Sequence, residues 1–165
     1  MSLRAEEKLR ILVLNGPNLN MLGRRQPEIY GTMTLDELNR IIVSHAESAN
    51  CPDLTFFQTN HEGQLVDLLQ TSARNYDGIV YNPAAHTHYS IAIRDAIAAI
   101  TIPVVEVHLT DITTREEFRR ISVMSDVCKA TFMGNGAKSY LDALDFLIDY
   151  LSGLSSDNYV EKSNA

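Results

Sequence analysis

Short apolar runs alternate with longer amphipathic stretches along this chain. The runs at 11–14, 54–57, 78–81, 104–107 and 130–133 are brief, mostly β-branched or aromatic, and flanked by turn residues. Such runs are typical of buried strands. Strands separated by helices run parallel, because each right-handed crossover returns the chain to the same edge of the sheet. The alternation therefore predicts a parallel α/β domain.

The stretches between the runs have helical periodicity. Thr34 and Glu37 form a capping box ahead of apolar residues that recur on one helical face. Further helices are expected at 64–73, 88–100 and 139–151, with a short turn at 115–120. The order βαβαβαβαβα predicts a flavodoxin-like, doubly wound, five-stranded parallel sheet. In such sheets ligands bind at the carboxyl ends of the strands.

The length of 165 residues predicts a single domain. We expect an N-terminal extension at 1–10, one catalytic domain at 11–151 and a flexible tail at 152–165, because the tail is rich in Ser, Asn and Asp. Residues 18–33 form a long polar connection. A long loop at the ligand-binding end of a domain is often a lid.

Charge and composition restrict the partners. Fourteen Lys and Arg against 21 Asp and Glu give a net charge of -7, which repels phosphate backbones and anionic lipids. We therefore expect no nucleic-acid and no membrane partner. Cys51 and Cys128 lack the C-x-x-C spacing of a zinc site and are expected to remain thiols. With no apolar signal region at 1–10 and no membrane-length apolar run, we expect a cytoplasmic protein.

Polar side chains follow four of the predicted strands. Because the carboxyl ends of parallel strands meet at one edge, these side chains are expected to form a site there. They are Asn15 and Asn18 after the first strand, Gln58, Asn60 and Glu62 after the second, Asn82, His86 and His88 after the third, and Glu106 and His108 at the end of the fourth.

The chemistry expected at this edge is acid–base chemistry. Neither G-x-G-x-x-G nor a P-loop is present, and the histidines have no recognised metal-ligand spacing. Glu106 and His108 lie on the same face of a strand, where a carboxylate can orient an imidazole. Tyr30 follows Arg25 by five residues, and a tyrosine becomes a useful base only where a cation stabilises the phenolate.

Several motifs, in order along residues 11–150, make the chain resemble the type II 3-dehydroquinases. They are LNGPNLNMLGRR at 14–25, YG at 30–31, QTNHEG at 58–63, NPAAHTH at 82–88 and EVHL at 106–109. The resemblance implies dehydration of 3-dehydroquinate to 3-dehydroshikimate by anti elimination through an enolate, in the shikimate or quinate pathway. It implies no cofactor and no metal, and a homo-oligomer that is a dodecamer.

The resemblance also implies a role for each matching residue. Tyr30 is the base at C2, Arg25 lowers its pKa, and His108, oriented by Glu106, protonates the leaving C1 hydroxyl. Asn18 helps to hold a water on the enolate oxygen. Implied substrate-binding groups are Asn82 and the backbone N–H groups of Leu109 and Thr110 for the carboxylate, His88 and Arg119 for ring hydroxyls, and Asp95 from a neighbouring subunit. Asp111 departs from the family pattern and places an acidic residue beside the anion-binding turn.

Two other functions compete with this one. A phosphoacceptor regulatory domain would need acidic residues at the ends of the first and third strands, where Asn15 and Asn82 stand. A hydrolase that uses the histidine cluster with a metal is the other alternative, and metal analysis of the purified protein would distinguish it.

Overall fold

The computed structural model describes residues 8–49 and 52–153. Its centre is a parallel sheet of β1 (Arg10–Asn15), β2 (Asp53–Gln58), β3 (Gly78–Asn82), β4 (Val104–His108) and β5 (Ala130–Met133). The strands lie in the order β2-β1-β3-β4-β5. This is the doubly wound, flavodoxin-like arrangement that the alternating sequence predicts.

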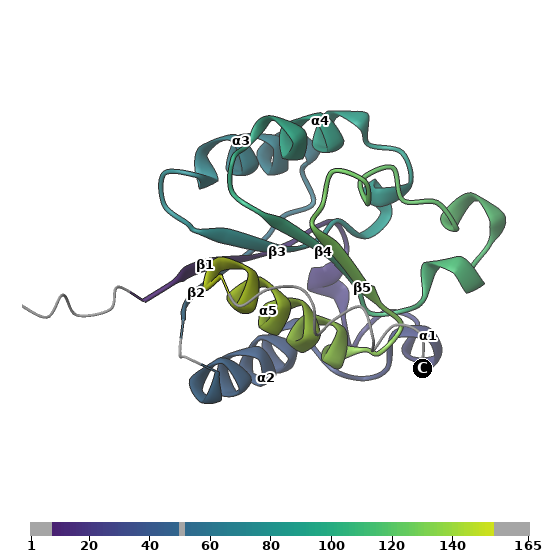
Figure 1. Ribbon diagram of the computed structural model, residues 1–165. Helices are drawn as coiled ribbons and strands as arrows, with labels where there is room; N and C mark the ends of the chain where they lie inside the picture. Colours follow the sequence, from purple (N-terminus) through teal and green to yellow (C-terminus); the bar gives the residue numbers. More distant parts are fainter. Residues whose placement is uncertain (1–7, 50–51, 154–165) are drawn as a thin grey trace, which may run out of the picture.

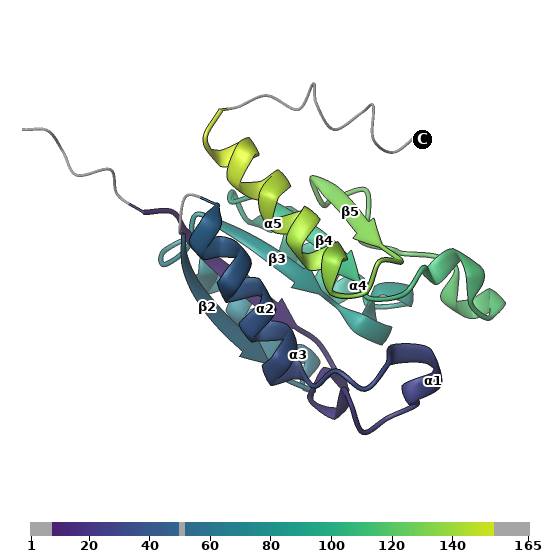
Figure 2. The ribbon, with the colours of Figure 1, turned by 90° about the horizontal axis from the view of Figure 1, so that it is seen from below.

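Helices cover both faces of the sheet (Figures 1 and 2). α2 (Leu35–Ser48) and α5 (Ala137–Leu151) pack on one face, and α3 (Glu62–Ser72) and α4 (Ile91–Ala99) pack on the other. The central strands β3 and β4 are buried along their whole length, because helices cover their two faces and neighbouring strands flank them.

The outer strands are less buried than the sequence suggests. β2 and β5 were expected to be buried like the others, but their side chains are mostly only partly buried. This expectation was wrong because apolar composition does not distinguish an edge strand from a central one. Each edge strand has a neighbour on one side alone.

Local sequence signals account for most helix boundaries. The capping box is confirmed, since the Thr34 side chain accepts from the Glu37 backbone N–H and the Glu37 carboxylate accepts from the Thr34 N–H. The helix expected from residue 88 starts later, at Ile91. Ser90 is its N-cap and accepts from the Ile93 N–H, while the residues before it form the 3₁₀ helix η2 (Ala84–His88).

Two irregular segments project from the carboxyl edge of the sheet, at the same end of the molecule (Figure 1). The first contains η1 (Leu19–Met21) and α1 (Pro27–Tyr30). The second contains η3 (Ile112–Thr114) and η4 (Glu117–Arg119), in place of the turn expected at 115–120. They bring side chains from outside the sheet to the ends of β1, β3 and β4.

The expected terminal segments lie mainly outside the described residues, which exclude 1–7, 50–51 and 154–165. Cys51 and most of the expected extension and tail fall there. Arg10 already belongs to β1, where it pairs with Asp53 and its guanidinium binds the Asp77 carboxylate at 2.9 Å. None of the helices within the described residues has the length and apolar character needed to cross a membrane.

Candidate active site

A cavity of about 210 Å³ lies at the carboxyl edge of the sheet, between the two irregular segments. Nine residues expected at the site line this cavity, and they come from four separate parts of the chain. These residues are Asn18, Arg25, Tyr30, Asn82, His88, His108, Leu109, Thr110 and Arg119. The fold therefore brings together most of the residues that the sequence motifs single out.

The turn after β1 is shaped by a close backbone approach. A Cβ at Gly16 would lie 2.7 Å from the carbonyl oxygen of Pro83, so this position requires glycine. Asn18 then adopts a left-handed conformation with φ 66°, which asparagine tolerates better than most residues. Its backbone N–H donates to Asn60 Oδ1 at 2.9 Å. These contacts hold Asn18 in the lining of the cavity.

Asn82 is held by a buried chain of hydrogen bonds. Its Nδ2 donates to the Tyr140 hydroxyl at 2.8 Å, and that hydroxyl donates to Asn15 Oδ1 at 2.7 Å. Its Oδ1 accepts from the Ala84 backbone N–H. Burial raises the pKa of Tyr140, so the phenol stays neutral and keeps its proton for donation. The second Nδ2 hydrogen of Asn82 is available for an acceptor in the cavity.

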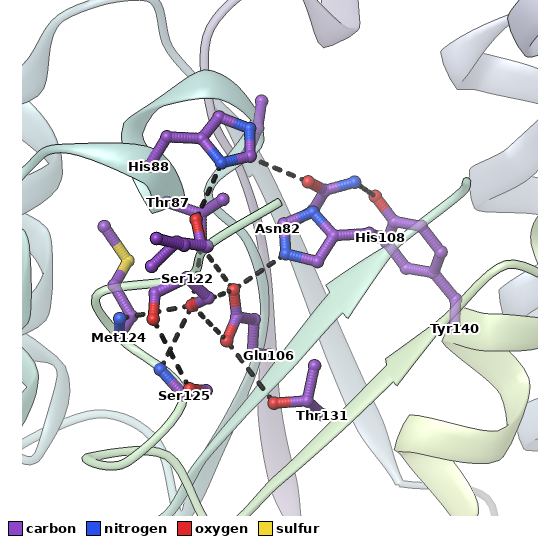
Figure 3. Close-up of polar contacts among 12 residues, drawn as sticks. Asn82, Thr87, His88, Glu106, His108, Ser122, Met124, Ser125, Thr131 and Tyr140 are labelled. Carbon is purple, nitrogen blue, oxygen red and sulfur yellow. Dashed lines mark hydrogen bonds and ion pairs between the residues drawn. The ribbon is translucent and has the colours of Figure 1, made fainter. Parts of the chain in front are cut away.

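His108 and Glu106 form a buried pair on β4 (Figure 3). The His108 Nε2 lies 2.7 Å from Glu106 Oε1. Burial opposes ionisation of Glu106, but hydrogen bonds from His108, Thr87 and Ser122 and the charge of His108 bring its pKa below the usual range. Because an ionised Glu106 can only accept, His108 donates through Nε2, and Nδ1 is its remaining polar atom.

His88 presents its imidazole in a fixed orientation. Its Nδ1 donates to the Ile121 carbonyl at 2.9 Å, which leaves Nε2 as the other polar atom of the ring. Desolvation lowers the pKa of His88, and its contact with the Ile121 carbonyl opposes that effect only in part. A neutral His88 with Nδ1 protonated can accept a hydrogen bond from a ligand hydroxyl.

Tyr30 lies between two arginines. Arg115 Nη1 donates to the Tyr30 hydroxyl at 3.2 Å, and this contact is the main reason that the pKa of Arg115 is raised. Arg25 contacts the ring face, with Cζ 5.9 Å from the ring centroid. A cation beside the hydroxyl favours the phenolate form that a tyrosine base requires.

The cavity is locally cationic although the chain is acidic overall. Three arginines, Arg25, Arg115 and Arg119, line it, and among the described residues its lining contains no Asp or Glu. Glu106 lies behind His108, and Glu116, 3.4 Å from Arg119 Nε, is over half exposed. A small anionic molecule therefore suits this cavity electrostatically.

Two acidic residues singled out from the sequence lie outside the cavity. Asp95 is exposed on α4, so this chain does not bring it to its own site. Asp111 caps η3 and accepts from the backbone N–H and hydroxyl of Thr113, and these contacts lower its pKa. The acidic side chain at the anion-binding turn is thus engaged with the turn itself.

Arg115, Tyr140 and Ser122 were not among the residues expected at the site. Arg115 lies in a loop with no periodicity, Tyr140 fits an ordinary amphipathic helix, and Ser122 follows a charged turn. The run of charge at 115–120 was a signal for Arg115, because cations at a carboxyl edge are candidates for binding anions. No group of three or more His, Cys, Asp or Glu side chains within 8–49 and 52–153 is arranged to hold a metal ion.

Fold and site together define an α/β enzyme equipped for acid–base chemistry on a small anionic molecule. The model of the family "Dehydroquinase class II" matches residues 9–148. The chain belongs to this family.

Its relatives agree with that assignment over most of their length. This chain is 52% identical to a 3-dehydroquinate dehydratase of Bacillus pumilus over 137 aligned residues. The alignment covers 83% of this chain and 92% of the relative. The crystal structure of a type II dehydroquinase from Butyrivibrio crossotus superposes with a TM-score of 0.82 at 46% identity, covering 85% of this chain and 97% of that one. The crystal structure of a type II dehydroquinase from Propionibacterium acnes superposes with a TM-score of 0.81 at 42% identity. This superposition covers 86% of this chain and 97% of that one.

Proposed function

We propose that this protein dehydrates 3-dehydroquinate to 3-dehydroshikimate by anti elimination, with Tyr30 as the base and His108 as the acid. Membership of the class II dehydroquinase family supports the overall reaction. The observation that carries the assignment of roles is the convergence of two groups on one cavity. Tyr30 reaches it from α1 with Arg115 on its hydroxyl, and His108 reaches it from β4 with Glu106 behind it.

The first step is removal of a proton from C2, which is α to the ketone at C3. The Tyr30 phenolate takes this proton, and the C2–H electron pair moves into an enolate whose charge rests on the ketone oxygen. Arg115 and Arg25 stabilise the phenolate before the transfer. Asn18, which lines the cavity, orients a water toward the enolate oxygen.

The second step is loss of the C1 hydroxyl. The enolate collapses to form the C1–C2 double bond, and the C1–O bond breaks as the doubly protonated His108 imidazolium donates the proton on its Nδ1, so that water leaves and a neutral imidazole with Nε2–H remains. The product is the conjugated enone. No electrons are gained or lost overall, so side chains can perform the reaction without a cofactor.

Substrate recognition uses the remaining groups of the cavity. Asn82 and the backbone N–H groups of Leu109 and Thr110 bind the carboxylate, and Arg119 and the His88 Nε2 bind ring hydroxyls. The free Nδ2 hydrogen of Asn82 and the acceptor character of His88 Nε2 support these assignments.

The test combines turnover with stereochemistry. Absorbance of the conjugated enone should rise when the protein meets 3-dehydroquinate. With substrate stereospecifically deuterated at C2, anti elimination releases the label from the face opposite to the C1 hydroxyl. Absence of turnover would contradict the proposed reaction, and release of the label from the same face would contradict the assignment of Tyr30 and His108 to opposite faces.

We further propose a cytoplasmic homo-oligomer, a dodecamer, in which Asp95 reaches the site of a neighbouring subunit. Asp95 is exposed on α4, and Tyr89 and Ile91, which precede it in the sequence, have large exposed side chains. Light scattering should give a mass far above 18.4 kDa. Mixed oligomers of Asp95→Ala and Tyr30→Phe subunits should regain activity, since some sites then receive both groups. A fully active monomer would contradict this arrangement.

A further inference from the structure

The Glu106 carboxylate receives more hydrogen bonds than its pairing with His108 requires (Figure 3). Ser122 Oγ lies 2.9 Å from Oε1 and 3.0 Å from Oε2, and Thr131 Oγ1 lies 3.4 Å from Oε2. Thr87 Oγ1 also donates to Oε1. Glu106 is 1% exposed, so three hydroxyls take the place of the water that would otherwise solvate its charge.

These donors determine the form of the carboxyl group. A buried carboxyl group without donors favours its neutral form, which could itself donate to His108. An ionised carboxylate can only accept, so it selects the His108 orientation with Nε2–H directed away from the cavity. The hydroxyls therefore influence which ring nitrogen faces a ligand.

Ser122 is the central donor of this group. Its Oγ accepts from the backbone N–H groups of Met124 and Ser125, each at 3.1 Å. These two donors occupy its lone pairs, so its one hydroxyl hydrogen is donated, and the acceptors within reach are the two Glu106 oxygens and Thr87 Oγ1 at 2.9 Å. The backbone N–H groups of Met124 and Ser125 thereby polarise the Ser122 hydroxyl, which strengthens its hydrogen bond to the buried carboxylate.

The residue before Ser122 fixes the second histidine of the cavity. The Ile121 carbonyl accepts from His88 Nδ1, and the Val123 N–H donates to the Thr87 carbonyl at 2.8 Å. Residues 121–123 thus contact the supports of both imidazoles. They follow directly on the segment that carries Arg115 and Arg119 into the cavity.

We propose that Ser122 is a positioning residue for the acid step, which acts through Glu106 to hold His108 with Nδ1 toward the leaving hydroxyl. This inference rests on the proposed function, in which His108 is the acid. Ser122 lines no part of the cavity itself, so its effect on the reaction passes through the carboxylate.

Ser122→Ala is compared with Ser125→Ala, which makes the same chemical change three residues away. The Ser125 hydroxyl contacts the Ser122 carbonyl at 3.5 Å and has no contact with Glu106. Ser122→Ala should lower kcat about tenfold or more with KM within about twofold, a part of the 10²- to 10⁴-fold that a general acid contributes. Ser125→Ala should have the same kcat and KM as the wild type. Ser122→Thr, which restores the hydroxyl at a partly exposed position, should recover most of kcat.

Hydrogen exchange separates the acid step from the base step. In deuterated water, a variant that forms the enolate but cannot protonate the leaving group returns deuterated substrate. Proton NMR of unreacted 3-dehydroquinate should therefore give a higher ratio of C2 exchange to dehydration for Ser122→Ala than for the wild type. An unchanged ratio, or a loss confined to KM, would overturn the proposal. If Ser122→Ala does not fold, Thr87→Val, which removes another hydroxyl from Glu106, is tested for the same rise in the ratio of C2 exchange to dehydration.

The imidazole nitrogens give a readout that needs no turnover. Nitrogen-15 shifts of His108 should report an Nε2–H that donates to a carboxylate in the wild type and Ser125→Ala, and a changed Nε2 shift in Ser122→Ala. Identical His108 shifts in all three proteins would overturn the positioning role. A wild type that does not dehydrate 3-dehydroquinate would contradict the proposed function, and the nitrogen shifts would still test the contact of Ser122.

Discussion

Arg115 Nη1 lies 3.2 Å from the hydroxyl oxygen of Tyr30, although 85 residues separate them in the chain. The contact joins the two irregular segments at the carboxyl edge of the sheet. Arg25, close to Tyr30 in sequence, contacts the ring face instead. The guanidinium nearest to the proposed base therefore comes from the other side of the cavity.

This geometry predicts different effects for the two arginines. Replacing Arg115 by Gln removes the charged donor on the Tyr30 hydroxyl, so kcat should fall more than KM changes. Arg25→Gln should lower kcat less, because the contact of Arg25 is with the ring face of Tyr30 and not with the hydroxyl. Steady-state assays of both variants under the same conditions check this. A loss confined to KM in Arg115→Gln would show that Arg115 serves binding and does not act on the base.

Tyr30→Phe should lower kcat much more than it changes KM. The hydroxyl acts on the proton in transit while the ring keeps its place between the arginines. A general base contributes about 10²- to 10⁴-fold, so kcat should fall at least about 10²-fold. Steady-state assays with Tyr76→Phe as the control measure this. A variant that keeps more than about a tenth of kcat would remove Tyr30 from the mechanism.

Tyr140→Phe should weaken substrate binding and stability together. It leaves the buried Asn15 Oδ1 and one Asn82 Nδ2 hydrogen without their partner, at a cost of about 1–3 kcal/mol. Tm should fall by about 2–10 °C and KM should rise, because Asn82 loses its fixed orientation. Tyr150→Phe, an exposed change on the same helix, is the control. Unchanged KM with lowered Tm would limit Tyr140 to a structural role.

Glu106 should contribute to stability in a pH-dependent way. Its folded pKa is below the ordinary 4.5, so its contribution is present above that value and is lost as pH falls through the lowered pKa. Glu106→Gln should be less stable than the wild type at neutral pH, and the difference should narrow below about pH 4.5. Urea unfolding at several pH values measures it, with exposed Glu47→Gln as the control. A difference in unfolding free energy between the wild type and Glu106→Gln that stays constant with pH would contradict the lowered pKa of Glu106.

Turnover should survive treatment with EDTA. Every proposed role is filled by a side chain, a backbone group or water, and the described residues arrange no metal-binding group of His, Cys, Asp or Glu. The expected kcat after dialysis against the chelator equals that of untreated enzyme. Loss of activity that a divalent ion restores would favour the metal-dependent alternative.

The sheet, most of its helices and most of the cavity lining could be predicted from the amino-acid sequence. Buried parallel strands need continuous apolar runs, and Thr34 with Glu37 satisfies the first N–H groups of α2 locally, so both leave a direct sequence signal. The polar residues at the strand ends converge because parallel strands finish at one edge. That rule alone predicts that Asn82 and His108 lie together, and both line the cavity.

The groups that orient these side chains could not be predicted in this way, because they come from distant parts of the folded chain. Arg115 reaches Tyr30 from an irregular loop, Tyr140 reaches Asn82 from α5 across 58 residues, and Ser122 reaches Glu106 through a turn. None of the three follows a period or a local motif. A hydrogen bond between distant segments depends on where the packed helices and loops place each atom, to within a few tenths of an ångström. Composition and periodicity carry no information at that precision.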